Sequence, residues 1–288
     1  MTKRIIQINL NRSPRAQDLL SQTMLDLDCG LACVSEPHRV PNDPRWARSS
    51  EQTPMAAVTW SGRTPPETVS VVTQGEGFVA VSWEGLIVVS CYFSPNKSIN
   101  QFRMFLVALG DAVADYTNKA LLVVGDFNAR SHIWDNTRPT SRGETILTWA
   151  STRDLRLLNN NLVPTCVRPQ GRSVVDLSWA SPAALSMVKS WEVMAEAETL
   201  SDHRYILMQI GGQKPWERGT ELSSFPKWNR KSLNADRLQA SIATYFWPRQ
   251  TENTSAEDLA AQLQDAMSLA SDAAMRRFKS KGKKAVYW

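Results

Sequence analysis

Short apolar runs recur along the first 210 residues, and most have the length and alternation that are typical of β-strands. The opening run alternates apolar and polar side chains, which indicates a strand and not a signal peptide. The pattern predicts strands over residues 4–10, 31–35, 55–61, 68–73, 78–83, 86–93, 120–124, 173–180, 190–195 and 205–210.

Helical periods lie between some of these runs. Ser13 and Pro14 suit the cap and first turn of a helix that reaches about residue 27. Two more helices are predicted over 99–116, with apolar residues on one face, and over 142–153. Strands and helices in this mixture predict an α/β fold, in which two packed β-sheets carry helices on their outer faces.

The pattern changes after residue 210. Gly211, Gly212 and Pro215 break the last strand, so we expect a domain over 1–212 and a linker over 213–226. Residues 227–288 are predicted to form a helical tail, with helices at 232–246 and 255–278. The second helix carries an apolar stripe of Leu259, Leu263, Met267 and Ala270. The abrupt end on an aromatic residue suggests a fragment of a longer protein.

Charge is distributed unevenly along the chain. The formal net charge is +5, but residues 1–210 contain equal numbers of basic and acidic side chains. The whole excess lies in residues 211–288, and six bases fall between Arg276 and Lys284. A basic balance favours an anionic partner such as nucleic acid, and we therefore expect the tail to bind DNA or RNA through salt-sensitive contacts.

The four cysteines are not arranged as a metal module. No CxxC pair occurs and only three histidines are available, which argues against a zinc site. Each cysteine lies in or beside an apolar run, so we expect buried free thiols and a reducing compartment. The longest apolar stretch, residues 86–93, is too short to span a bilayer, so a soluble intracellular protein is expected.

The string VVGDFNA at 123–129 is the sharpest candidate for chemistry. A predicted strand ends at Gly125 and is followed by Asp126 and Asn128, whose spacing directs both side chains from one edge of the sheet. A carboxylate can take a proton from water or hold a cation, and the amide can assist without competing for the proton. The alternative is an ordinary turn, in which these residue types are common.

Ser201, Asp202 and His203 form a second string, immediately before the last predicted strand. An imidazolium held there by a neighbouring acid would stabilise the charge that develops on a phosphate. Adjacent residues cannot line up as nucleophile, base and orienting acid, so this is not a catalytic triad. The alternative is a local cap with a solvated Asp and His.

Other polar residues lie near predicted strand ends, where each alone would be an ordinary solvated side chain. Asp176 is an acid inside an apolar run, and a buried acid needs a partner, which His203 would supply. Together the residues predict a cation site, a water activator and charge stabilisers for metal-assisted attack of water on a phosphodiester, with Mg²⁺ or Mn²⁺ as the cofactor. The three groups are Glu36, Asp202 and Asn11 for the metal, Asp126 with Asn128 for water, and His203, Tyr92 and Asn9 for charge.

The order of these strings resembles the exonuclease–endonuclease–phosphatase superfamily, which includes apurinic endonucleases and DNase I-like nucleases. The resemblance covers about residues 4–210 and rests on Asn9, Glu36 and the GDFNA, SVVDLS and SDH strings. GDFNA followed by RSHIW is similar to endonuclease domains of non-LTR retrotransposons, as is LLN at 157–159 leading to SVVDLS. The tail, from KWN at 227–229 to the closing AVYW, is more loosely similar to the linker before their reverse transcriptase.

This resemblance implies a four-layered α/β sandwich and a divalent-metal nuclease. Such an enzyme nicks chromosomal DNA in the nucleus and leaves a 3′-hydroxyl that primes reverse transcription. It further implies that Glu36 and Asp202 hold the metal and that Asp126, aided by Asn128, activates water. His203, positioned by Asp176, would contact the phosphate, with Tyr92 and Asn9 lining its pocket. Several relatives have an acid where Asn11 stands, and an amide there weakens the field on the metal.

The partners implied are double-stranded target DNA, a reverse transcriptase domain of a parent polyprotein, and element RNA through the tail, without a membrane. The chain has no [YF]xDD string, so a polymerase would lie outside it. The segment 167–172 is expected to form a hairpin near the DNA minor groove, with Arg168, Arg172, Arg130 and Ser173 as DNA contacts. A solvated turn is the alternative.

Other functions remain open from the sequence. Within the superfamily the alternatives are an apurinic-site repair endonuclease and a phosphatase, and outside the enzymes a nucleic-acid-binding module. His132 and Trp134 follow the catalytic string, and local packing is favoured over base stacking for an aromatic in that place.

Overall fold

The structure is a computed structural model that describes residues 2–62, 64, 68–135, 139–159, 163–211, 232–245 and 256–276. Contacts divide the chain into two units, Met1–Pro215 and Trp216–Trp288. The linker predicted over 213–226 lies outside the described residues, and the domain boundaries stay a prediction.

Two six-stranded sheets form the larger unit. The first has the order β13-β14-β1-β2-β4-β3, made of Val188–Val193, Ile206–Gly211, Thr2–Asn9, Leu31–Ser35, Ala56–Trp60 and Trp46–Arg48. The second has the order β5-β6-β7-β8-β12-β9, made of Val69–Gly75, Phe78–Trp83, Leu86–Tyr92, Ala120–Asp126, Asp176–Ala180 and Arg156–Leu157. Each sheet contains one parallel pair, β1 with β2 and β7 with β8. A separate hairpin pairs β10 (Cys166–Arg168) with β11 (Gly171–Ser173).

Alternation along the strands sorts the core into layers. In β8, Leu122 and Val124 belong to the core between the sheets, whereas Leu121 and Val123 belong to the core beneath the outer helices. β1 alternates in the same way, with Ile5 between the sheets and Ile6 on the outer side. A central strand can be apolar on both faces only when layers cover both, and this requires helices outside each sheet.

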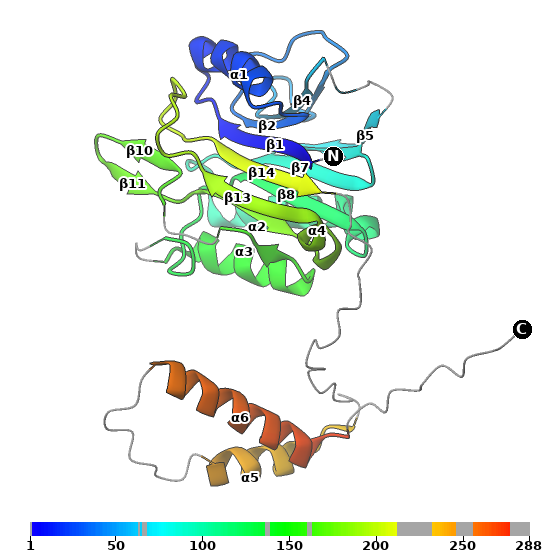
Figure 1. The fold of residues 1–288 in the computed structure, drawn as a ribbon, viewed down its shortest axis with the longest axis vertical. Helices are drawn as coiled ribbons and strands as arrows, with labels where there is room; N and C mark the ends of the chain where they lie inside the picture. The colour runs from blue at the N-terminus through cyan, green and yellow to red at the C-terminus, as the bar shows by residue number, and fades with distance from the viewer. Residues whose placement is uncertain are drawn as a thin grey trace, which may run out of the picture. The chain divides into compact units, whose positions relative to one another are not determined.

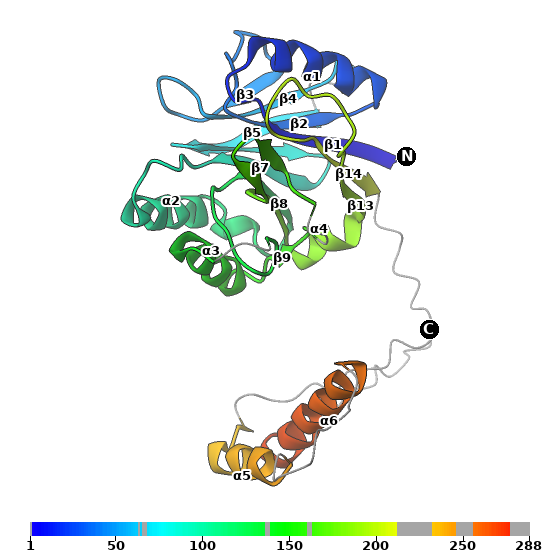
Figure 2. The ribbon, with the colours of Figure 1, turned by 90° about the vertical axis from the view of Figure 1, so that its left-hand side faces the viewer.

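Helices provide those outer layers (Figures 1 and 2). α1 (Pro14–Asp26) covers the first sheet through Leu20 and Met24. α2 (Ile99–Ala112) and α3 (Ser141–Thr152) cover the second sheet, and the short helices η2 (Ala114–Tyr116) and α4 (Pro182–Met187) follow α2 and β12. The order helix, sheet, sheet, helix confirms the predicted four-layered α/β sandwich.

Most predicted strands and helices of the larger unit are confirmed within one or two residues at most ends. The single strand predicted over 173–180 is wrong, because it divides into the end of β11 and the start of β12. Val174 donates its backbone N–H to the Asp135 carboxylate at 3.3 Å, and Val175 and Asp176 both donate to Thr165 Oγ1 at 3.2 Å. Side chains thus take the bonds that a neighbouring strand would supply. The short strands β3 and β9 and the helix α4 were not predicted, whereas the hairpin expected over 167–172 is confirmed as β10 and β11.

The smaller unit contains α5 (Ala235–Tyr245) and α6 (Ala256–Ala274). The predicted apolar stripe of α6 is only partly right: Ala270 is buried, but Leu263 and Met267 are 51% and 64% exposed. Leu259 lies outside the described side chains. The buried face is instead a run of small residues four apart, Ala266, Ala270 and Ala274, which allow a close approach of another helix backbone.

All four cysteines are free and buried, as the sequence predicts. Burial raises the pKa of the Cys29 thiol to about 11, so this thiol stays protonated and unreactive at neutral pH. Within the described residues, no helix combines the length and the apolar character that crossing a bilayer requires.

Gly125 fixes the approach of β8 to β7 beside the site described below. Its φ is +149°, and a Cβ there would lie 2.0 Å from the Cys91 carbonyl oxygen. We expect Gly125→Ala to destabilise the fold in two ways, by backbone strain at this φ and by overpacking of the new Cβ, each costing about 1–3 kcal/mol of unfolding free energy. Gly171→Ala is the matched control, because Gly171 has a φ of +150° but open space around the new Cβ. Denaturant unfolding should show the larger loss for Gly125→Ala; equal losses would contradict the steric argument.

Candidate active site

The candidate residues lie at one edge of the sandwich, where strands of both sheets end or begin. In the first sheet, Asn9 ends β1 opposite Ser35, which ends β2. In the second sheet, Tyr92 ends β7 opposite Asp126, which ends β8. Asp176 begins β12 and is also paired with Asp126, because β12 runs antiparallel to β8. The carboxyl ends of parallel strands thus place residues that are far apart in sequence side by side.

Asn9 joins the two sheets at this edge. Its amide nitrogen donates to the Glu36 carboxylate at 3.1 Å and to the Asp126 carboxylate at 2.9 Å. Its amide oxygen accepts the backbone N–H of Asn11 at 2.8 Å. Asn9 and Asp126 are almost fully buried, at 1% and 2% exposed. Two acids from different sheets are therefore held together by one amide.

Ser35 adds a second link between the sheets and was missed by the sequence analysis. Its hydroxyl donates to the Cys91 carbonyl at 2.8 Å and accepts the backbone N–H of Asp126 at 3.3 Å. Ser90 contributes a parallel link by donating to the Val34 carbonyl at 3.2 Å. These hydroxyls fix the end of β2, and hence Glu36, against the ends of β7 and β8. The only signal in the sequence was the position of Ser35 directly before Glu36.

Asn128 holds Asp126 through its backbone. Its N–H donates to Asp126 Oδ1 at 2.9 Å, while its side-chain amide donates to the Phe93 carbonyl at 3.1 Å. The side chain therefore ties the loop after β8 to the end of β7, and the backbone orients the carboxylate. Asn128 lies beside Asp126, as predicted.

Three site residues have a left-handed backbone. The φ values of Asn11, Glu36 and Asn128 are 46°, 45° and 46°. Asn adopts this region more readily than other residues, but Glu does so rarely, and strain of this kind is concentrated at functional sites. The turn at Glu36 directs a charged residue back toward the sheet edge, directly after a strand whose five residues are all buried.

Asp176 and His203 form the buried pair that the sequence predicts. His203 Nδ1 lies 2.8 Å from Asp176 Oδ2, and the two side chains are 1% and 2% exposed. Ser201 donates to the Asn9 carbonyl at 2.8 Å and Thr199 to the His203 carbonyl at 2.8 Å. The segment before β14 is thus fixed to the end of β1.

Electrostatics separates the two buried acids. Burial raises the pKa of Asp126 to about 7, with a further contribution from Asp176, although His203 and the hydrogen bonds from Asn128 and Asn9 oppose the shift. Burial alone would lower the pKa of His203, but the Asp176 carboxylate outweighs it, helped by Cys166 and Asp126, and the net pKa lies well above the usual range. The surroundings therefore favour the protonated form of His203 and raise the affinity of the neighbouring Asp126 for a proton.

Tyr92 completes the edge as a neutral phenol. Burial raises its pKa well above the usual range, and the neighbouring Glu36 and Asp126 carboxylates add to the shift. The side chain is 6% exposed and forms a hydrogen bond with Glu36. A phenol that keeps its proton can donate to an anionic group.

The described residues fit a divalent cation at this edge. Ligand atoms of Asp126, Asp176 and His203 lie within 4.8 Å of one another, as do those of Cys166, Asp202 and His203. Because Asp176 favours the protonated form of His203, the carboxylates of these groups are the candidate ligands. Asp176 Oδ1 is buried with no hydrogen-bond partner among the described residues, as expected of an oxygen that a cation or water would serve. Glu36 reaches this group through Asn9, whereas the Asn11 side chain is exposed.

The predicted DNA contacts have different surroundings. Arg168 is half-exposed on β10 and forms an ion pair with Asp202, and Arg172 is exposed on β11. Ser173 is buried at the base of this hairpin, opposite Cys166. Arg130 lies 4.0 Å from the Asp135 carboxylate. Two of the four thus present positive charge on the hairpin.

Arg142 supports the site and was not identified from the sequence, where it served only as the start of a helix. Its guanidinium donates to the carbonyls of Ser94 at 3.2 Å and Pro95 at 3.0 Å, and also to that of Lys97. It lies over the ring of Phe93, 5.1 Å from the centroid. These contacts hold the loop that follows Tyr92.

Trp134 packs locally within the core, which is the role that the sequence favours over base stacking. The side chain is fully buried, donates from Nε1 to the Ala129 carbonyl at 3.2 Å and meets Trp179 edge to face. It therefore has no face available for stacking on a base. His132 is exposed.

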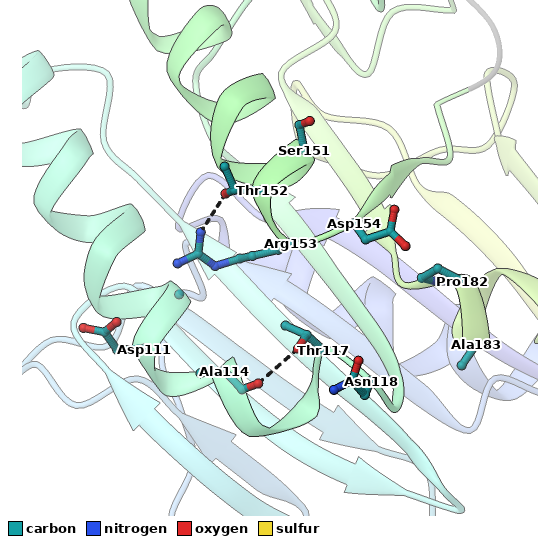
Figure 3. A pocket seen from close by; sticks show the side chains of 11 residues that line it. Asp111, Ala114, Thr117, Asn118, Ser151, Thr152, Arg153, Asp154, Pro182 and Ala183 are labelled. Carbon is teal, nitrogen blue, oxygen red and sulfur yellow. Dashed lines mark hydrogen bonds between the residues drawn. The ribbon is translucent and has the colours of Figure 1, made fainter. Parts of the chain in front are cut away.

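A pocket of about 730 Å³ lies away from these residues (Figure 3). Asn118 lines it just before β8 begins, whereas Asp126 ends β8, so the pocket lies at the opposite end of that strand. Its lining mixes the acids Asp111 and Asp154 with Arg153, and Arg153 is engaged with Thr152. The pocket therefore shares no residue with the candidate active site.

The comparisons with known proteins agree with this geometry. Residues 86–207 match a family model described as Endonuclease-reverse transcriptase. The structure is similar to the endonuclease domain of TRAS1, a telomere-specific non-LTR retrotransposon, with 24% identity and a TM-score of 0.65 over 74% of this chain and 100% of that one. No curated protein matches the sequence.

Two further solved structures share the fold. One is a 3′-5′ exonuclease (NExo) from Neisseria meningitidis, with 16% identity and a TM-score of 0.56 over 73% of this chain and 100% of that one. The other is an AP endonuclease from Archaeoglobus fulgidus, with 14% identity and a TM-score of 0.56 over 72% and 99%. The chain is thus similar, over residues 86–207, to the endonuclease–reverse transcriptase family, and its sandwich shares the fold of these solved structures, in agreement with the sequence resemblance.

Proposed function

We propose that this protein is a divalent-metal-dependent endonuclease that nicks double-stranded DNA and leaves a 3′-hydroxyl to prime reverse transcription. The observation that carries the proposal is the buried edge where Asn9 joins Glu36 and Asp126 and where Asp176 holds His203. The family match to an endonuclease–reverse transcriptase model supports it.

Each side chain has a role that follows from its surroundings. Asp126, whose pKa lies near neutrality, accepts the proton of the attacking water, while the Asn128 backbone fixes its orientation. His203, kept protonated by Asp176, contacts the phosphate and stabilises the charge that develops on it. Tyr92 and Asn9 line the phosphate pocket beside His203 as hydrogen-bond donors.

Glu36 and Asp202 are the proposed metal ligands, with Asn11 beside them and Mg²⁺ or Mn²⁺ as the cation. When bound, the cation polarises the phosphoryl oxygen and neutralises the leaving oxygen. Several carboxylates crowded into one buried edge repel one another, which is unfavourable unless a positive charge is supplied. His203 supplies part of that charge, and the cation would supply the rest.

The setting of the reaction is part of the same proposal. The target is chromosomal DNA in the nucleus. Its contacts are Arg168, Arg172 and Arg130, together with Ser173 at the base of the hairpin. The basic tail would bind DNA or element RNA, and a reverse transcriptase domain of a parent polyprotein would extend the 3′-hydroxyl. The family match covers only residues 86–207, and the fold is shared with an AP endonuclease from Archaeoglobus fulgidus. Cleavage of DNA at abasic sites is therefore a second candidate function.

Asp126→Asn should reduce nicking of supercoiled plasmid with Mg²⁺ by about 10²–10⁴-fold, because a general base contributes on that scale. Asp154→Asn is the matched control, since Asp154 is an exposed acid paired with Arg156 at 2.6 Å, away from the site. Nicking by Asp126→Asn at the native rate would refute its role.

The same assay on an intact duplex and on one with an abasic site separates the two candidate functions, because only the repair activity requires the lesion.

The pKa of Asp126 predicts a pH-dependent stability in EDTA. The folded protein keeps a proton on Asp126 up to about pH 7, because burial raises its pKa, whereas the unfolded chain releases the proton near the ordinary aspartate pKa of 3.8. Raising the pH from about 5 to about 8 should therefore destabilise the wild type relative to Asp126→Asn, by an amount of the order of 3 kcal/mol. Thermal melts at both pH values measure this shift, and Mg²⁺ should reduce it. A difference between the two proteins that is independent of pH would contradict the electrostatic account.

Asp176→Asn tests the imidazolium. The Asp176 carboxylate raises the pKa of His203, whereas burial lowers it, so the variant should lose the proton of His203 at a lower pH. The alkaline limb of the pH–rate profile for nicking should consequently move to lower pH in Asp176→Asn. The Asp154→Asn profile should match that of the wild type. An unchanged alkaline limb in Asp176→Asn would mean that the rate does not depend on a protonated His203.

A further inference from the structure

The β10–β11 hairpin is joined at its base to the segment that carries Asp202 and His203. Cys166 forms an isolated antiparallel bridge with His203, and Val167 donates its backbone N–H to the Asp202 carbonyl at 2.8 Å. Arg204 donates to the Thr165 carbonyl at 2.7 Å. β10 therefore runs alongside residues 202–204, and the hairpin, which Figure 1 shows at one side of the sandwich, is attached directly to the candidate site.

Arg168 uses this attachment to contact a catalytic-site acid. Its Nε donates to Asp202 Oδ2, and the side chains of Arg168 and Asp202 are 51% and 20% exposed. The other oxygen, Asp202 Oδ1, lies 3.5 Å from the Ser201 hydroxyl and 3.9 Å from His203 Nε2. One oxygen of this acid is thus occupied by a guanidinium, and the other faces the buried His203.

A cation and a guanidinium cannot use the same carboxylate oxygen without placing two positive charges side by side. Asp202 has His203 on its other side, so a divalent cation that takes Oδ2 must first displace Arg168. A half-exposed guanidinium that is displaced in this way can turn to a phosphate, which it binds through paired hydrogen bonds.

We propose that Arg168 is a positioning residue that competes with the divalent cation for the Asp202 carboxylate. The inference rests on the proposed function, in which Asp202 is a metal ligand. In the free protein Arg168 occupies Asp202 and weakens metal binding, and the same side chain becomes available to DNA once the cation has replaced it. The partner of Arg168 on the hairpin therefore depends on whether a cation occupies the metal site.

Arg172 provides a matched control. It is exposed on the same hairpin, opposite Val167 across the two strands, and carries the same charge. Among the described residues, the ion pair with Asp202 is formed by Arg168. Removal of either arginine deletes one positive charge near the site, but only removal of Arg168 frees the Asp202 oxygen.

The test is direct titration of the full chain with Mn²⁺, followed by electron paramagnetic resonance, without DNA and at low salt. Arg168→Gln should tighten Mn²⁺ binding about two- to fivefold, the range expected for release of a partly exposed ion pair. Arg172→Gln should leave the affinity unchanged, and Arg168→Lys should lie between Arg168→Gln and the wild type. Raising the salt to about 1 M should abolish the difference, because the ion pair is then screened.

Asp202→Asn separates failure of this inference from failure of the proposed function. In that background, which should itself bind Mn²⁺ more weakly, Arg168→Gln should have no effect on Mn²⁺ affinity. If the wild type binds Mn²⁺ but Arg168→Gln equals Arg172→Gln, or binds Mn²⁺ more weakly, the competition is refuted while the metal site stands. If the wild type binds no Mn²⁺, or Asp202→Asn binds it as tightly as the wild type, the proposed metal role of Asp202 fails, and the inference fails with it.

Discussion

The amide of Asn9 is the contact on which the candidate site depends. It comes from the first sheet and donates to one acid of its own sheet, Glu36, and to one acid of the other, Asp126. Two carboxylates that would repel each other are held together by a neutral donor that adds no charge. The sandwich supports this contact through the Ser35 and Ser90 hydroxyls, which link the sheet edges on the buried side.

The cost of this arrangement is electrostatic, and it divides the site into two parts. Asp126 is crowded by Asp176 and buried, so its affinity for a proton rises. Asp176 is compensated by His203, whose protonated form it favours. One acid is thus poised to exchange a proton, while the other is committed to holding an imidazolium. A base beside a cationic group suits the phosphodiester hydrolysis that we propose.

Much of the fold followed from the sequence because its signals are local. Alternation and apolar runs predicted the long strands, and Ser13 with Pro14 predicted the start of α1. The short strands β3 and β9 escaped prediction, because two or three residues carry no period. The strand predicted over 173–180 failed at a place where the side chain of Thr165, which lies outside that apolar run, accepts two backbone hydrogen bonds.

Candidate side chains could be found in the same way only when they stood in recognisable strings. Asp126, Asn128, Asp176 and His203 did so, and the structure brings them to one edge. Ser35 and Arg142 were missed because their role depends on which strand ends become neighbours, and no local pattern records that. The ion pair of Arg168 with Asp202 was likewise invisible, since it arises from the pairing of the hairpin with the segment before β14.

The most direct test of the central claim is to locate the metal. Crystals soaked in Mn²⁺ and measured at the manganese absorption edge should show an anomalous peak between the carboxylates of Glu36 and Asp202, close to Asp126. Such a peak would establish that the edge organised by Asn9 holds a cation site. A structure in which Mn²⁺ binds elsewhere, or does not bind, while these carboxylates keep the contacts described above, would contradict the account.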